Sequence, residues 1–126
     1  MGIIEGTTRP KSVTAAYDFA VDGGAVSTIT LRGDNKIPAG AVITGGYVDI
    51  ETACLSGTGT IAIQVESAGD ILAASAQAAL TTGRKSVVPA GTGATSVKTT
   101  AERSVAIVIA TAAFTAGKFR VVLFYK

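Results

Sequence analysis

The sequence contains no histidine and no tryptophan, and it has a single cysteine, Cys54. Without histidine, the Ser–His and Cys–His pairs that activate most nucleophiles are absent, and so is an ordinary zinc site. One cysteine cannot form a disulfide within the chain, and its apolar neighbours Ala53 and Leu55 predict a small buried hydrophobic residue. These absences predict a protein that is not an enzyme and has no cofactor or metal.

Large side chains are also scarce, because only four Phe and three Tyr occur in 126 residues. Small residues fill the space instead: 22 Ala, 17 Thr, 15 Gly and 8 Ser account for 62 positions. Such a composition suits flat, closely packed surfaces better than a sculpted ligand pocket. Hydrophobic residues make up 48% of a chain of one-domain length, which predicts a packed core.

Long apolar runs are missing as well. No run approaches the roughly 18 residues that a membrane-spanning helix needs, so we expect a soluble chain with no membrane partner. Residues 1–5 lack the basic region and the apolar stretch of a signal peptide.

Charge is unevenly divided along the chain. Residues 1–70 hold eight acids and four bases, a net of −4, whereas residues 71–126 hold one acid and seven bases, a net of +6. A sandwich fold would interleave the two halves, so this division need not survive in space. If it survives, it offers complementary patches for contact between subunits.

Short β-rich runs separated by turn residues dominate the chain. In the clearest run, 60–66, Ile61, Ile63 and Val65 alternate with outward polar residues, as in a strand with one buried face. Similar runs occupy 25–31, 42–52, 104–110 and 119–125, and the last two predict an antiparallel pair at the centre of the fold. The pattern predicts an all-β protein, an antiparallel β-sandwich or a jelly-roll-like barrel.

Two segments depart from this pattern. Residues 1–24 are predicted to form an extended N-terminal arm around Pro10, which leaves 25–126 as a single β domain; a strand around Tyr17 fits within the arm. Residues 70–80 are rich in Ala, begin with a good N-cap in Asp70 and are followed by Gly83. They predict one short helix, with an extended loop as the alternative.

Side chains that could support catalysis are few. Asp49 and Glu51 would project from one face of a strand, roughly 7 Å apart, with Glu66 on a neighbouring face. This set would suit a glycosidase pair or a calcium site, but the solvated face of an outer sheet is the favoured interpretation. Lys85 and Ser86 are the remaining base–nucleophile pair, and consecutive residues of a strand point in opposite directions.

Binding motifs are equally weak. The two Gly-Thr-Gly sequences at 57–59 and 91–93 lack the third glycine and the helix of a nucleotide-binding loop. The tripeptide Arg32-Gly33-Asp34 matches the motif that integrins bind, but Gly33-Asp34 is also ordinary turn chemistry. Basic residues are dispersed and aromatic residues few, so no nucleic-acid partner is expected.

Two stretches combine turn residues with a following strand. The first is Ile-Pro-Ala-Gly-Ala-Val-Ile-Thr at 37–44, which leads into the strand-like residues 47–52. The second is Thr-Ala-Gly-Lys followed by a β run that ends in Tyr, at 115–125. Both stretches resemble small virion structural proteins of tailed bacteriophages, of the capsid-decoration or head-associated type. The resemblance covers about 80 residues and consists of turn residues and strands. It implies an all-β structural protein and brings no catalytic residues with it.

By this resemblance, the chain is expected to be a non-catalytic decoration or cement protein that binds the phage head in many copies. Its partners would be the major capsid protein and further copies of itself, in a symmetric oligomer such as a trimer. It would lie on the capsid surface of the virion after synthesis in the host cytoplasm.

Arg9, Pro10 and Lys11, in the predicted arm, are the candidate residues for contact with the shell. The alternative function is a tail or fibre recognition module that binds a cell-surface receptor or glycan. Tyr47, beside the two carboxylates at 49 and 51, is the feature that suggests it.

Overall fold

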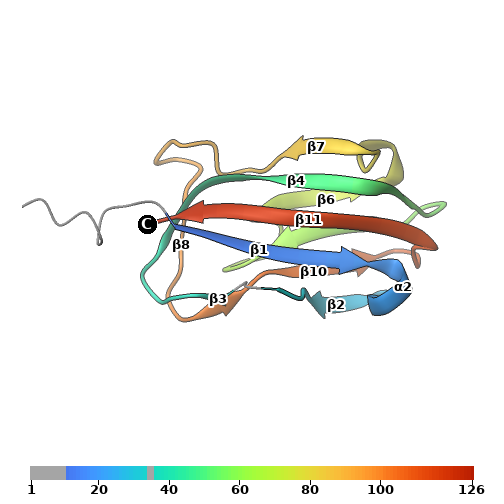
Figure 1. The fold of residues 1–126 in the computed structure, drawn as a ribbon, viewed down its shortest axis with the longest axis horizontal. Helices are drawn as coiled ribbons and strands as arrows, with labels where there is room; N and C mark the ends of the chain where they lie inside the picture. The colour runs from blue at the N-terminus through green and yellow to red at the C-terminus, as the bar shows by residue number, and fades with distance from the viewer. Residues whose placement is uncertain (1–10, 34–35) are drawn as a thin grey trace, which may run out of the picture.

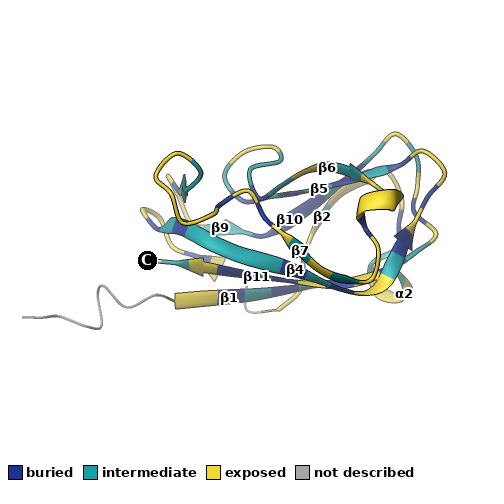
Figure 2. Cartoon of the chain, turned by 90° about the horizontal axis from the view of Figure 1, so that it is seen from above, coloured by how far each residue is buried: buried dark blue, intermediate teal, exposed yellow. Residues whose placement is uncertain are grey.

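The computed structural model describes residues 11–33 and 36–126, and these form a two-layered antiparallel β-sandwich. Figure 1 shows the strands running along the long axis of the molecule, and Figure 2 shows the two layers edge-on. An all-β antiparallel fold, as the turn-bounded runs predict, is therefore confirmed.

One layer, which we call sheet A, is built around the longest strands of the chain. Its hydrogen-bonded order is β1 (Lys11–Asp18), β11 (Ala116–Tyr125), β4 (Val42–Leu55) and β7 (Gly83–Ser86), and β8 (Val97–Lys98) also pairs with β4. Strand β11 pairs with β1 on one side and with β4 on the other, so it is the central strand of this layer.

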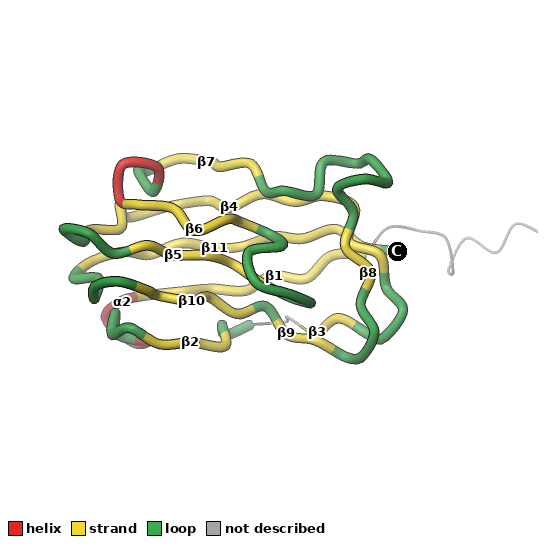
Figure 3. Tube along the Cα trace, turned by 180° about the vertical axis from the view of Figure 1, so that it is seen from behind, coloured by secondary structure: helices red, strands yellow, loops and turns green. Residues whose placement is uncertain are grey.

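The other layer, sheet B, has four shorter strands. Their order is β2 (Ser27–Thr30), β10 (Ala106–Ala110), β5 (Thr60–Gln64) and β6 (Leu72–Ala76). A two-stranded ribbon of β3 (Lys36–Ile37) and β9 (Arg103–Ser104) lies near one end of the sandwich (Figure 3). The helical elements α2 (Phe19–Asp22) and η1 (Gln77–Ala79) are single turns near the opposite end.

The core lies between the sheets because each long strand alternates inward apolar and outward residues. Strand β11 directs Phe119, Val121 and Leu123 inward, and Ile107 and Ile109 of β10 are buried on the facing sheet. Strand β5 buries Ile61 and Ile63, and Val65 follows just beyond it, as the alternation in 60–66 predicts. A single cluster of buried side chains therefore spans both layers.

A ring contact, hydrogen bonds and an ion pair fix the end of β1. Tyr17 is buried with its ring 5.1 Å from that of Phe119, and its hydroxyl donates to the Gly23 carbonyl oxygen at 2.6 Å. Burial is the main reason that the pKa of Tyr17 is raised to about 12. Arg32 donates from Nε and Nη2 to the two carboxylate oxygens of Asp22, both at 3.1 Å, and its backbone bridges to that of Ala16. These contacts connect β1 of sheet A to the chain that leaves β2 of sheet B.

The predicted pairing of 104–110 with 119–125 is wrong, although both segments are strands. Strand β10 pairs with β2 and β5 in sheet B, while β11 pairs with β1 and β4 in sheet A. The connecting segment, 111–115, crosses from one layer to the other. The two apolar strands therefore contribute buried side chains to the same core from opposite layers rather than pairing side by side in one sheet.

The predicted helix at 70–80 is also wrong, because the segment forms β6 and the short turn η1. Asp70 accepts hydrogen bonds from the backbone N–H groups of the three residues 65–67, so it caps the turn before it rather than a helix after it. Ile71 and Leu80 are buried. The backbone of Ile71 donates to Ile63 and accepts from Val88, and the carbonyl of Leu80 accepts from the Cys54 N–H. These tertiary partners outweigh the helical preference of the intervening alanines.

The described part of the predicted arm belongs to the sandwich. Residues 11–18 form β1, which pairs with β11 along its whole length, and residues 19–22 form α2. The β domain therefore includes these residues and does not begin at residue 25. Residues 1–10 lie outside the described residues.

A bulge in β4 reverses the side on which its residues point. Ile43 is buried, and so are Val48 and Ile50, although an even number of residues (44–47) lies between 43 and 48 and a regular strand would point these two in opposite directions. The register against β11 shifts between Ile43 and Gly45, which inserts one extra residue in β4. Gly46 follows the shift with φ +152°, and a Cβ there would overlap the carbonyl oxygen of Val122.

Replacing Gly46 should therefore destabilise the sandwich strongly. Gly46→Ala is expected to lower the free energy of unfolding by about 2 kcal/mol or more, because it combines an unfavourable φ with a backbone overlap. Gly45→Ala is the matched control, since a Cβ at Gly45 would have Pro89 at 3.9 Å as its nearest neighbour. Urea unfolding of both variants measures the difference, and equal stability of the two would contradict this account of the bulge.

Candidate interaction surface

The outward face of sheet A collects most of the charged side chains of the described strands. Each of the four main strands of the sheet contains two charged residues. The alternation with buried residues places six of them on the outward face: Asp18 of β1, Asp49 and Glu51 of β4, Arg84 of β7, and Lys118 and Arg120 of β11. Lys11 and Lys85 occupy positions of the opposite direction, since Lys11 is on the same side of β1 as buried Val13 and Lys85 is in register with buried Val48. Opposite charges on neighbouring strands then meet, because the acids are mostly in the first half of the chain and the bases in the second.

The acids of β4 lie among bases from the neighbouring strands. Glu51 contacts Lys118 at 3.5 Å and Arg120 at 3.6 Å, and Asp49 is in register with both Arg120 and Arg84. The side chains of Glu51 and its two partners are about half exposed, so each pair contributes little to stability. Acids from the first half of the chain therefore lie beside bases from the second half, on neighbouring strands of the folded protein.

An aromatic patch lies on the same outward face. We define it as Tyr47, Arg84 and Phe124, from strands β4, β7 and β11. The guanidinium carbon of Arg84 lies 4.8 Å from the centre of the Tyr47 ring, and the Tyr47 and Phe124 rings are 6.4 Å apart. Phe124 is 40% exposed and is in register with Gly45, which has no side chain to cover it. Tyr and Arg are enriched among the residues that dominate protein–protein binding energy.

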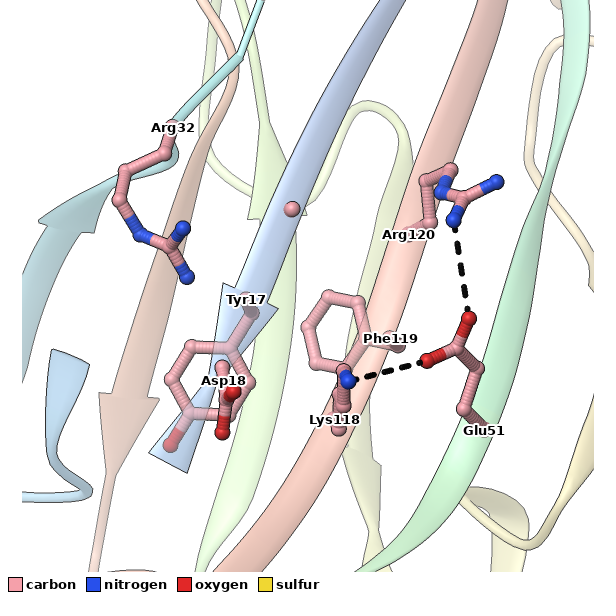
Figure 4. A pocket seen from close by; sticks show the side chains of 8 residues that line it. Tyr17, Asp18, Arg32, Glu51, Lys118, Phe119 and Arg120 are labelled. Carbon is pink, nitrogen blue, oxygen red and sulfur yellow. Dashed lines mark ion pairs between the residues drawn. The ribbon is translucent and has the colours of Figure 1, made fainter. Parts of the chain in front are cut away.

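A shallow pocket of about 240 Å³ opens near the other end of this face (Figure 4). Tyr17 and Phe119 lie deep in it, and Asp18, Arg32, Glu51, Lys118 and Arg120 surround it. Arg32 is paired with Asp22, Glu51 is paired with the two bases of β11, and Asp18 caps α2 by accepting from the backbone of Ala20. A charged ligand would have to displace these contacts, so the pocket is poorly suited to a small molecule.

The three carboxylates singled out from the sequence do not form one site. Asp49 and Glu51 do share the outward face of β4, as predicted, but Glu66 follows β5 in the other sheet. Among the described residues, no group of three His, Cys, Asp or Glu side chains could hold a metal ion. The interpretation of these acids as part of a solvated sheet face agrees with this arrangement.

Glu66 is instead the centre of a hydrogen-bond network that holds the turn before β9. Its carboxylate accepts from the Thr100 hydroxyl at 2.7 Å, from the Thr100 backbone N–H at 3.1 Å, and from Arg103 Nε at 2.9 Å. The Thr100 hydroxyl and then Arg103 are the main causes that lower the pKa of Glu66 to about 2. Sheet B is thereby connected to the β3–β9 ribbon.

The other candidates have structural explanations. Cys54 is buried, as predicted, and burial raises the pKa of its thiol to about 11. Lys85 donates from Nζ to the Thr81 hydroxyl at 2.9 Å, and Ser86 is exposed beside it on β7. Arg32 of the integrin-like tripeptide is engaged by Asp22, and Asp34 lies outside the described residues.

The predicted shell-contact residues are mostly untested by the structure. Arg9 and Pro10 lie outside the described residues, and Lys11 is exposed at the start of β1. Sequence analysis missed Arg84 and Phe124 as members of an aromatic patch, because their neighbours come from other strands. Tyr47 was predicted as part of a recognition surface together with the carboxylates at 49 and 51 of its own strand, whereas the structure groups it with Arg84 and Phe124.

No family model and no curated protein matches the chain. Its fold does match chains from three solved phage capsids. A chain in the acid-stable capsid of Helicobacter pylori bacteriophage KHP30 aligns with a TM-score of 0.63 and 12% identity, over 92% of this chain and 86% of that one. A chain in the capsid of cyanophage Pam1 gives 0.63 and 23%, over 93% and 84%. A chain in the capsid of Ralstonia phage GP4 gives 0.59 and 20%, over 91% and 83%.

These likenesses establish that the sandwich shares its fold with chains found in phage capsids. They extend over nearly the whole chain, so the resemblance in fold is not confined to one hairpin. In the part of the chain that the structure describes, no helix is long and apolar enough to span a membrane.

The Glu66 network predicts a specific loss of stability in acid. Because the pKa of Glu66 is lower in the folded chain than in the unfolded chain (about 4.3), its contribution is complete above about pH 5 and decreases as the pH falls towards 2. Wild type and Glu66→Gln should therefore differ in urea unfolding at pH 6 and converge near pH 2. Glu102→Gln is the control, since Glu102 is exposed and its pair with exposed Lys36 is long, at 4.0 Å. A difference that persists unchanged at pH 2 would rule out this role for Glu66.

Proposed function

We propose that the chain is a non-catalytic structural protein of a phage virion, which binds the capsid shell in many copies as a decoration or cement protein. The observation that carries the proposal is the likeness in fold, over more than 90% of the chain, to chains from three phage capsids. The sequence supports it too, since the chain has no histidine. The major capsid protein is the partner, and the outer surface of the capsid is the location.

The outward face of sheet A is the surface that meets the shell. The aromatic patch supplies an exposed ring and a guanidinium group at its centre, and the charged residues around it supply orientation. Because a shell presents the same contact many times, each contact can be weak while the assembled layer remains stable. Binding, not chemistry, is the task of these side chains.

The N-terminal residues form a second contact in this proposal. Lys11 begins β1 at the edge of sheet A, so Arg9 and Pro10 immediately precede the surface that meets the shell. Deleting residues 1–24 would remove β1 from sheet A and unfold the protein. Deleting residues 1–10 leaves β1 intact and isolates the effect of the N-terminal residues.

Copy number in purified particles tests the function directly. Quantitative mass spectrometry of the phage that encodes this chain should find it in hundreds of copies per particle, comparable with the major capsid protein. A handful of copies would favour a tail or fibre module, and absence from particles would reject the virion role.

Binding of the purified protein to particles that lack it tests the surface. Phe124→Ser combined with Arg84→Ala should weaken binding at least about ten-fold, because it removes the centre of the patch. Val21→Ser is the matched control, since Val21 is an exposed apolar side chain (65%) on α2, away from the patch. A variant lacking residues 1–10 is measured in parallel.

Full binding by the Phe124/Arg84 variant would exclude the aromatic patch as the contact. Equal loss in Val21→Ser would show that the effect is not specific to this surface. Far-UV circular dichroism and thermal unfolding confirm that each variant is folded before binding is compared.

A further inference from the structure

The two sheets differ completely in charge. Strands β1, β4, β7 and β11 of sheet A contain two charged residues each, whereas β2, β5, β6 and β10 of sheet B contain no Asp, Glu, Lys or Arg. An antiparallel sheet with one buried face normally places polar and charged residues on the other. The absence of charge on the outward face of sheet B therefore needs an explanation.

Except for Gln64, the side chains on this outward face are short. The register places Thr28, Val108 and Ala62 in one row across three strands, and Thr30, Ala106 and Gln64 in the next. Val108 lies in the middle of the sheet and is partly exposed. Val26, which is 56% exposed, extends the uncharged surface beyond the start of β2.

We propose that copies of this chain bind one another through the outward face of sheet B, centred on Val108. The proposal rests on the proposed function and deepens it, because it separates the surface that meets other copies from the surface that meets the shell. Both surfaces can be occupied at once, since they are on opposite layers of the sandwich (Figure 2).

The distribution of charge identifies a second copy as the occupant. In a symmetric oligomer, residues near the rotation axis meet the same residues of the neighbouring copy, so any charge there faces a like charge. A surface without charge avoids this repulsion and is also easier to remove from water. A rotation axis through the outward face of sheet A would instead bring charged side chains, such as Lys118 and Arg120 on β11 and Arg84 on β7, near their own copies.

The edges of the two sheets support the same assignment. Exposed edge strands commonly carry Lys or Pro, which discourage pairing with another chain. In sheet A, edge strand β1 begins with Lys11, and edge strand β7 contains Arg84 and Lys85. In sheet B, neither β2 (Ser-Thr-Ile-Thr) nor β6 (Leu-Ala-Ala-Ser-Ala) contains either residue type. The edge strands of this face therefore bring no charge to a neighbouring copy.

The chain provides matched variants for a test. Val108 at the centre of sheet B is in register with Thr28 on an edge strand, and Val122 at the centre of sheet A is in register with Thr14 on an edge strand. The test uses the full chain alone in solution, with its mass measured by sedimentation velocity across micromolar concentrations. Circular dichroism and thermal unfolding confirm folding.

Wild type should sediment as a multiple of the 12.6 kDa chain. Val108→Lys should weaken self-association at least about ten-fold, and Thr28→Lys should do the same if the central substitution impairs folding. Val122→Lys and Thr14→Lys should associate as wild type does. A monomeric wild type would overturn the proposal, and so would dissociation by the sheet A variants or wild-type association of both folded sheet B variants.

The outcomes also separate this inference from the proposed function. A monomer in solution that is nevertheless present in hundreds of copies per particle would reject the self-contact and leave the virion role standing. Self-association through sheet B by a protein absent from particles would do the opposite.

Discussion

Strand β11 is the element on which the rest of the sandwich depends. It is hydrogen-bonded along both sides, to β1 and to β4, and its inward side chains form one wall of the core. Its outward side chains Lys118 and Arg120 pair with Glu51 of β4, and Phe124 completes the aromatic patch. Core, charge pairing and exposed aromatic surface therefore share one ten-residue segment, and the Gly46 bulge allows β4 to follow it closely.

Strand positions could be predicted from the sequence because alternation is a local property. Runs such as 60–66 have their inward and outward residues as predicted. Strand partners could not be predicted in the same way: 104–110 and 119–125 are both strands but lie in different layers. The segment 70–80 was predicted as a helix from its local preference. Its backbone partners at 54, 63 and 88 all lie outside the segment, and they override that preference.

The candidate surfaces show the same limit. The shared face of Asp49 and Glu51 follows from period two and was predicted, but the bases beside them come from other strands. The sequence shows that acids are concentrated in residues 1–70 and bases in residues 71–126. That all charged residues in the strands of the two main sheets belong to sheet A depends on strand order, which the sequence does not show. Sheet A combines charged and aromatic residues. The edge strands of sheet B, β2 and β6, contain neither a charged residue nor Pro. The two sides of the sandwich are therefore chemically distinct.

Burial of Cys54 has a practical consequence. The thiol lies between the layers with its pKa raised to about 11, so at neutral pH it is almost entirely in the unreactive protonated form. Because it is the single cysteine of the chain, a second cysteine introduced on either outer face would be the one fast-reacting thiol. A fluorophore or a gold cluster could then be attached once per copy without altering the core, which would make each layer visible separately in an assembled particle.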